Sequence, residues 1–422
     1  MVNSVRVPEI RKKLLFTAAM LALYRLGAYI PAPGIDTNTV NSIAKNFAGS
    51  NVLGFLNLFS GGSLSRFAVF ALGIMPYITA SIILQLLQVV VPSLEKLRKE
   101  GEVGQQKITQ YTRYLTVGLA FFQSIGYVFL FRTFASQTGP GHDIIKGGFT
   151  FAHVFVIVLA LTSGTVLLMW FGELITQRGI GNGISLMIFA SIISRIPHGV
   201  QAWWTNPDQV FKVMMPIIAL AVIAGVVFIQ EGQRRIPVQY AKRVVGRRMA
   251  GGGSTYLPLR VNMAGVIPVI FAASLMAFPP TIGQLVQKGW AKDFANFLNP
   301  NGTAYIIGES LLIIVFTYFY TAVTFNPVEQ ADNLKKYGGF IPGVRPGRPT
   351  AEYLDRILAR LTFPGALYLA AIAALPTVLI NQTSANFFFG GTSILIVIGV
   401  ALDTMKQLEA QLMMRNYEGF LK

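Results

Sequence analysis

The stretch that decides the fold is VLGFLNLFSGGSLSRFAVFALGIMPYITASIILQLLQVVV, residues 52–91, because it joins two apolar runs of unequal length. The second run, residues 68–91, has the roughly 20 residues that a helix needs to cross a bilayer. The first run, 52–59, would cover only about 12 Å as a helix. It can be an interfacial anchor, an end of the following span, or backbone that fills a protein cavity at membrane depth. The Ser60-Gly61-Gly62-Ser63 turn would let it move independently of that span.

The whole chain has the composition of an integral membrane protein, with 53% hydrophobic and 13% charged residues among 422. Apolar runs long enough to span recur along it, and the sequence predicts an all-α fold with ten transmembrane helices. Arg195 interrupts the fifth run and Pro376 the ninth, so these two are the weakest. The runs are residues 14–30, 68–91, 114–131, 151–171, 183–200, 213–230, 261–286, 304–325, 364–380 and 393–413.

Basic residues indicate the orientation, because Lys and Arg are retained on the cytoplasmic side during insertion. With both termini inside, 26 of the 35 Lys and Arg residues fall in cytoplasmic segments and 8 outside. We therefore expect an even number of spans and an uncleaved first span rather than a signal peptide. The absence of cysteine excludes disulfides and thiolate metal sites, and the three histidines fall in different segments. No metal and no cofactor are expected.

Much of the net charge of +17 lies in two predicted cytoplasmic loops, residues 231–260 and 326–363. These loops can simply obey the positive-inside rule or contact anionic lipid headgroups. However, IPVQYAKRVVGRR alternates apolar and basic residues and predicts a hairpin that ends at the GGGS turn. In the second loop, FIPGVRPGRP holds Arg345 and Arg348 on a stretch stiffened by Pro and Gly. Structured RNA or an acidic protein surface would suit both loops.

Nothing in the sequence indicates an enzyme. No loop carries the Gly-rich Lys-Ser/Thr signature of a phosphate-binding loop, so we expect no ATP or GTP hydrolysis by this chain. GIGNGIS, residues 179–185, resembles a dinucleotide-binding turn only superficially, because no strand precedes it. It predicts instead a turn that starts a helix at the membrane surface.

Ten spans divide into two halves of five, residues 1–200 and 201–422, which enter the membrane inverted relative to each other. Such halves meet at a central interface. A solute transporter would display its site as intramembrane polar residues. The candidates can equally snorkel or form interhelical hydrogen bonds. They are Arg25, His153, Arg195, Glu309, Thr79, Gln85, Gln123 and Asn262.

Isoleucine pairs in spans 2 and 5 favour a different device. Ile74 and Ile78, like Ile184 and Ile188, are four residues apart and so share a helix face. Periodicity alone favours ordinary packing. Stacked rows of this kind can also narrow a pore to an apolar ring that blocks ions by dewetting.

Six motifs, in this order along the chain, resemble the SecY family of bacterial protein translocon channels. They are FALGIMPYITASIILQLL, RGIGNGIS, RRIPVQYAKR, VNMAGVIPVIFA, FNPVEQADNLKKYGGFIPGVRPGRPT and FFFGGTSILIVIGVALDTMKQ. The resemblance runs from about residue 6 to the end. It implies two pseudo-symmetric inverted halves that form a clamshell around a central pore and open laterally between spans 2, 3, 7 and 8.

The resemblance also implies site residues. A pore ring falls on Ile74, Ile78, Ile184, Ile188, Ile270 and Ile396. A plug falls on about residues 52–66, including Phe59, Ser60, Gly61, Gly62 and Arg66. The lateral gate includes Thr79 and Asn262, and docking of cytoplasmic partners falls on Arg243, Arg247, Arg248, Arg345 and Arg348.

The implied function is movement of unfolded polypeptides across the membrane, with lateral release of transmembrane segments into lipid. The implied partners are the small subunits SecE and SecG, the SecA motor ATPase, the ribosome, signal peptides with nascent polypeptides, and membrane lipids. The implied location is the bacterial cytoplasmic membrane, with both termini cytoplasmic. A secondary transporter of a small solute is the alternative.

Overall fold

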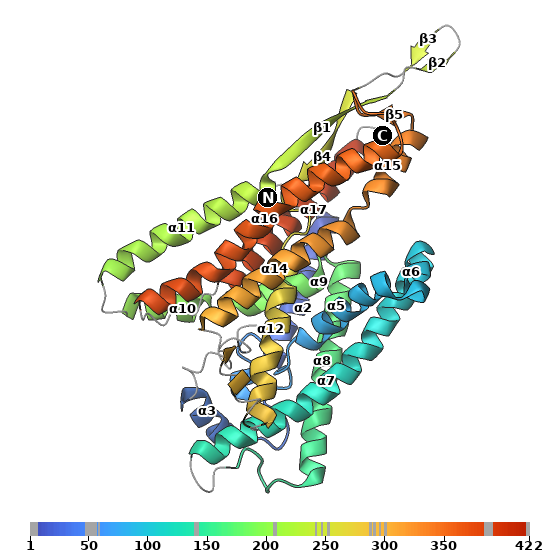
Figure 1. The fold of residues 1–422 in the computed structure, drawn as a ribbon. Coiled ribbons are helices and arrows are strands. Elements are labelled where there is room, and N and C mark those ends of the chain that lie inside the picture. The colour runs from blue at the N-terminus through green and yellow to red at the C-terminus, as the bar shows by residue number, and fades with distance from the viewer. Residues whose placement is uncertain are drawn as a thin grey trace.

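The computed structural model describes residues 7–46, 57, 60–138, 143–205, 209–240, 243–245, 248–250, 254–286, 289, 293–294, 297–298, 302–383 and 391–418. Helices dominate these residues (Figure 1). In chain order, the helices up to residue 193 are α2 (Pro8–Gly27), α3 (Thr37–Asn46), the short 3-10 helix η1 (Leu64–Arg66), α5 (Met75–Val90), α6 (Pro92–Lys99), α7 (Glu102–Thr138), α8 (Phe151–Arg178) and α9 (Gly183–Ile193). The helices that follow are α10 (Ile196–Thr205), α11 (Gln209–Glu231), α12 (Ile267–Val286), α14 (Thr303–Thr324), α15 (Pro327–Lys336), α16 (Arg348–Thr383) and α17 (Gly391–Glu418).

Nine of the ten predicted spans each overlap one of these helices. By length and apolar composition, five helices in the described residues can cross a membrane alone, or six if α5 and α6 form one span bent by 98°. The fifth predicted span, 183–200, is wrong as one helix: α9 ends at Ile193, and α10 begins after a turn at Ser194 and Arg195. The ninth is continuous, because α16 runs through Pro376.

The second predicted span begins later than expected. Residues 67–74 form turns, and helix α5 starts only at Met75. Two residues explain this boundary. Gly73 has a φ of 60°, which ends any helix arriving there, and Pro76 occupies the first turn of α5, where a missing N–H costs nothing.

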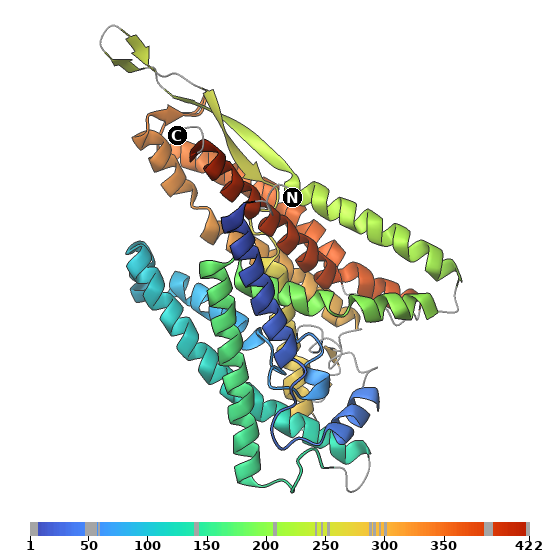
Figure 2. The same cartoon turned by 180° about the vertical axis from the view of Figure 1, so that it is seen from behind.

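In the two opposite views the helices form two groups (Figures 1 and 2). Helices α2 and α5–α9 gather on one side, and α11 with α14–α17 on the other. Helix α12 extends out of the second group and packs against α5 and α7 of the first. Both ends of the chain lie toward the end of the molecule from which the strands project. The predicted boundary at residue 200 falls within α10.

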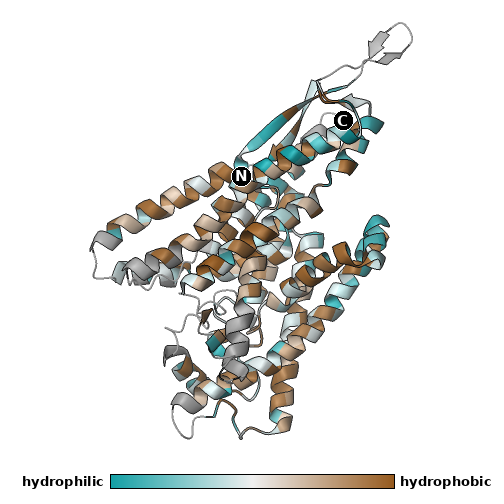
Figure 3. Cartoon of the chain, viewed as in Figure 1, coloured by the Kyte–Doolittle hydropathy of each residue, from teal (hydrophilic) through white to brown (hydrophobic). Residues whose placement is uncertain are grey.

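An arm of strands extends from the helices, as the hairpin prediction anticipated. Strand β1 (Gln233–Tyr240) pairs antiparallel with β4 (Ser254–Arg260) and with β5 (Gly339–Phe340). Farther out, β2 (Arg243–Val245) pairs with β3 (Arg248–Ala250). The hairpin therefore doubles back between β2 and β3 rather than at GGGS, whose serine, Ser254, is the first residue of β4. Hydrophilic residues are frequent along β1, in α15 and in α6 (Figure 3).

The main hydrophobic core lies where the two groups of helices meet. It takes buried side chains from α2, α5, α8 and α9 on one side and from α11, α12, α14, α16 and α17 on the other. A second core lies between η1, α7 and α8, and a third joins the base of the arm to α16. Movement of one group of helices relative to the other would therefore change the packing of the central core.

Candidate functional site

All six isoleucines predicted for the pore ring lie in the central core. They come from four helices of both groups: Ile74 precedes α5 and Ile78 lies in it, Ile184 and Ile188 lie on α9, Ile270 on α12 and Ile396 on α17. Five are at most 6% exposed, and Ile184 is half-buried against them. The isoleucines that are far apart in sequence therefore share one apolar cluster.

Helix α9 owes its place to the GIGNGIS turn. The Asn182 side chain caps the helix by accepting hydrogen bonds from the amides of Ile184 (3.1 Å) and Ser185 (3.3 Å). Gly183 crosses α8 so closely that a Cβ there would lie 2.0 Å from the Gly172 carbonyl oxygen. The prediction of a helix-starting turn is thereby explained: cap and glycine together set Ile184 against α8.

The Ile74 and Ile78 pair is held by the start of α5. The amide of Ile78 donates to the carbonyl of Ile74 at 3.1 Å, so the two residues are one helical turn apart. This agrees with the predicted shared face, although Ile74 is the N-cap of α5 rather than a residue within a longer helix.

Part of the predicted plug is visible as a compact, buried turn. Ser60, Ser63 and Leu64 are at most 2% exposed. The amide of Gly62 donates to the Asn57 carbonyl (3.0 Å), and the amide of Leu64 donates to the Ser60 hydroxyl oxygen (3.1 Å). Phe59, with residues 51–56 and 58, lies outside the described residues. We call residues 60–66 the SGGS segment. Its serine and glycine residues form hydrogen bonds with one another and with Asn57 inside the protein.

The two residues predicted for a lateral gate lie in different settings. Thr79 is half-buried on α5 and donates to the Met75 carbonyl at 3.0 Å. Asn262 was expected inside a span, which is wrong: it lies in the turn before α12. Its side-chain amide donates to the Gly265 carbonyl at 2.9 Å, and Gly265 has a φ of 63° that closes this turn. Helix α12 itself does pack between α5 and α7.

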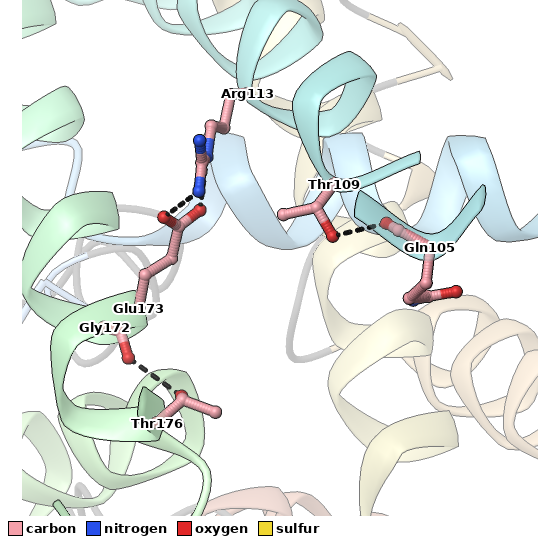
Figure 4. A network of polar contacts seen from close by, with 6 residues as sticks. All are labelled: Gln105, Thr109, Arg113, Gly172, Glu173 and Thr176. Carbon is pink, nitrogen blue, oxygen red and sulfur yellow. Dashed lines mark hydrogen bonds and ion pairs between the residues drawn. The ribbon is translucent and has the colours of Figure 1, made fainter. Parts of the chain in front are cut away.

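Sequence reasoning missed an ion pair between α7 and α8 (Figure 4). Arg113 donates from Nε to Oε1 of Glu173 at 2.8 Å and from Nη2 to Oε2 of the same carboxylate at 2.6 Å. Such bidentate pairs are stronger than single contacts. Both residues lie just beyond the ends of predicted spans, and their opposite charges at neighbouring helix ends were the available signal.

Of two other polar residues near span ends, one differs from expectation. Glu309 was expected to snorkel, but it is only 6% exposed, and its Oε1 atom has no hydrogen-bond partner. Tyr305, one turn earlier on α14, is 4% exposed. In contrast, His153 is exposed at the start of α8 and donates from Nδ1 to the Gly148 carbonyl at 3.2 Å. These two transporter candidates therefore lie in different environments and on separate helices.

The predicted docking arginines lie on the arm and on the loop beside it. Arg243 and Arg248 belong to β2 and β3, while Arg247 lies outside the described residues. Arg345 is exposed in the turn after β5. Arg348 is the first residue of α16 rather than a loop residue, and its guanidinium lies 3.2 Å from Glu352 one turn later.

The family model of SecY matches residues 68–405. The chain belongs to the SecY family. A protein translocase subunit SecY of Mycobacterium tuberculosis (strain ATCC 25618 / H37Rv) is 52% identical over 437 residues, which cover 100% of this chain and 99% of that protein. The resemblance stated from six motifs is therefore confirmed over the full length.

Solved structures have the same fold. One is of a SecY protein whose plug domain stabilises the closed state of the translocation channel and maintains a membrane seal; the TM-score is 0.65 with 20% identity, over 96% of this chain and 93% of that one. Another is Sec61 in a canine ribosome-channel complex from the endoplasmic reticulum, with a TM-score of 0.62, 17% identity and coverage of 96% and 93%.

These similarities confirm the predicted fold class, an all-α multi-pass membrane protein of the SecY type, and the predicted function as a protein-conducting channel subunit. They give no support to a secondary transporter of a small solute. We therefore do not assign the buried carboxyl group of Glu309 to a substrate-binding site.

Proposed function

We propose that the six isoleucines form the constriction of this SecY-family channel and that residues 52–66 are the plug that seals it. The observation that carries the proposal is that both groups of helices contribute isoleucines to one apolar cluster. Branched apolar side chains around a narrow path exclude ions by dewetting and still yield to a polypeptide. The predicted plug ends in the SGGS segment, whose Ser60 carbonyl contacts Tyr24 of this core, while its Leu64 packs in the second core.

The lateral gate in this proposal lies between α12 and its neighbours α5 and α7. These contacts join the two predicted halves, so separating them opens a path from the centre of the molecule to lipid. Thr79 supplies a polar group at the α5 side. Asn262 acts through the turn that it closes before α12, where a change of backbone direction is needed for α12 to swing.

Cytoplasmic partners dock, in this proposal, on the arm and on the turn that carries Arg345. An acidic protein surface suits the SecA motor, and phosphates suit ribosomal RNA. Nucleotide hydrolysis belongs to such partners and not to this chain. SecE, SecG and lipid cover the apolar faces of the helices. Helix α11 is the strongest candidate for such a covered face, because the apolar side chains of Leu220 and Phe228 on it are 73% and 80% exposed.

The proposed location is the bacterial cytoplasmic membrane, with the arm and both termini on the cytoplasmic side. The common position of the two ends of the chain beside the arm supports this orientation. The basic residues that favour retention inside lie in the same part of the molecule.

The experiment is deletion of residues 52–66 in the complete translocon, reconstituted into planar bilayers. Loss of the plug raises the resting ion conductance, while the complex still assembles and still translocates a secretory substrate. If the deleted protein unfolds, the segment is part of the structural core. If it folds and its resting conductance equals that of the parent, residues 52–66 are not the seal.

A further inference from the structure

Arg25 is the one basic residue inside the first predicted span. It lies in the last turn of α2, and no carboxylate in the described part of the chain pairs with it. Its Nη1 atom donates instead to the carbonyl of Gly61 at 2.9 Å. A charge at membrane depth is kept only where it has a partner or a task. Here the partner is the backbone of the SGGS segment.

Tyr24, the neighbour of Arg25, reaches the same place. It is 2% exposed, and its hydroxyl lies 2.5 Å from the hydroxyl of Ser191 on α9 and 3.5 Å from the Ser60 carbonyl oxygen. A Cβ at Gly61 would lie 3.0 Å from the Arg25 guanidinium and 3.2 Å from both the Tyr24 hydroxyl and the Ser191 Cα atom. Two consecutive residues of α2 therefore donate hydrogen bonds to two consecutive carbonyls of the segment: Tyr24 to Ser60 and Arg25 to Gly61.

The far end of the segment returns to the same helix end. The guanidinium of Arg66 lies 4.0 Å from the centre of the Tyr29 ring, and that of Arg25 lies 5.5 Å from it. Such cation–π contacts are attractive. One short stretch that begins in the last turn of α2, residues 24–29, therefore contacts both the first and the last residues of the SGGS segment.

Residues 24–29 therefore hold the segment at two points. Tyr24 and Arg25 hold the carbonyls of Ser60 and Gly61, and the Tyr29 ring lies against Arg66.

We propose that Tyr24, Arg25 and Tyr29, together with Ser191, form a latch that holds the SGGS segment in its seated position. The inference rests on the proposed role of residues 52–66 as a plug and adds the residues that set how easily the plug leaves. Opening removes the carbonyl partner of Arg25, so the strength of that bond sets part of the cost of opening.

The test compares two substitutions of graded expected effect in the complete translocon. Arg25→Met removes the charge and the donor but keeps an apolar side chain of similar length. A hydrogen bond to a charged group is worth enough that its loss raises the population of the unseated segment about tenfold to a hundredfold. Tyr24→Phe removes one hydroxyl and has a smaller effect of the same sign.

Two readouts follow the segment. The first is resting ion conductance in planar bilayers. The second uses the absence of cysteine from the chain: Ser65→Cys places a single thiol on the segment, and its rate of reaction with a membrane-impermeant maleimide reports how often the segment is unseated. Arg25→Lys, which keeps a charged donor, restores much of the parental behaviour. Arg11→Met, an exposed arginine on the same helix, is the matched control and changes neither readout.

The outcomes separate the latch from the plug. If Arg25→Met and Tyr24→Phe leave conductance and labelling unchanged while deletion of 52–66 raises conductance, the latch is wrong and the plug stands. If the deletion itself changes nothing, the plug is wrong. If Arg25→Met fails to assemble, the shift expected of Tyr24→Phe decides the question.

Discussion

At the scale of single residues, Ile78 and Ile188 distinguish a pore ring from ordinary packing. Both are at most 5% exposed and lie in the central core, Ile78 on α5 and Ile188 on α9. In a close-packed core, removal of such a side chain leaves a cavity and costs about 2–5 kcal/mol. In a ring, the side chain borders a path that other residues or water can fill. Stability and ion exclusion should therefore respond differently.

We predict that Ile78→Ser and Ile188→Ser each raise the resting ion conductance of the reconstituted channel while thermal stability falls by less than the core cost. The physical reason is that a hydroxyl group wets the constriction. The matched control is Ile357→Ser, a buried residue of the third core at the base of the arm, which lowers stability without a leak. If the resting conductance of both ring variants equals that of the parent, these isoleucines are ordinary core residues and not a pore ring.

At the scale of elements, the crossing of α8 and α9 positions half of the α9 contribution to the cluster. A Cβ at Gly183 would collide with the backbone of α8 at Gly172. We predict that Gly183→Ala destabilises the protein by about 1–3 kcal/mol, because overpacking forces backbone shifts, and that it raises resting conductance by displacing Ile184. Thermal unfolding and bilayer recording measure the two effects.

The matched control for this crossing is Gly118→Ala on α7. A Cβ there meets nothing within 4 Å, so the substitution leaves packing alone and favours the helix by up to about 1 kcal/mol. Equal stability loss in both variants would mean that glycine content, and not the α8–α9 contact, sets the result.

The loop after β5 carries a prediction about partners. Arg345 is exposed and lies in a turn, so Arg345→Glu should leave stability within about 0.5 kcal/mol of the parent. Binding of the motor ATPase or of ribosomes to the translocon weakens, because the reversed charge repels acidic groups that the arginine attracted. Lys146→Glu, an exposed residue outside the arm and its neighbouring loop, is the control. Undiminished binding by the Arg345 variant would remove this residue from the docking surface.

These elements also show how far sequence reasoning reaches. Nine apolar runs predicted single helices, and alternation of apolar and basic residues predicted the hairpin, because both signals are local. The break in the fifth run lies at Arg195, the residue that made this run weak in the sequence, whereas the late start of α5 depends on the positive φ of Gly73. The grouping of Ile74, Ile188, Ile270 and Ile396 is not local at all, and periodicity favoured packing. Only the family resemblance connected them.

At the scale of the whole molecule, hydrogen bonds also cross between the groups of helices away from the core. Lys13 on α2 donates to the side-chain oxygen of Gln411 on α17 at 3.4 Å. Arg98 on α6 donates to the carbonyl of Val323 in the last turn of α14, at 2.7 Å. Positive charge is favoured at a helix C-terminus, where carbonyls lack partners. The contact is exposed, so it is worth little in free energy. It nevertheless marks two elements that must separate if the clamshell opens on this side.

We therefore predict that joining positions 98 and 323 blocks translocation. In this cysteine-free chain, Arg98→Cys and Val323→Cys can be linked by a short reducible crosslinker. Substrate translocation stops on linking and returns on reduction, because the link holds α6 against α14. Linking Glu95→Cys to Lys99→Cys, one turn apart on α6, controls for modification of that helix and leaves transport intact. Full transport through the 98–323 linked channel would mean that α6 and α14 move together, and the moving boundary would then lie elsewhere, between α12 and α5.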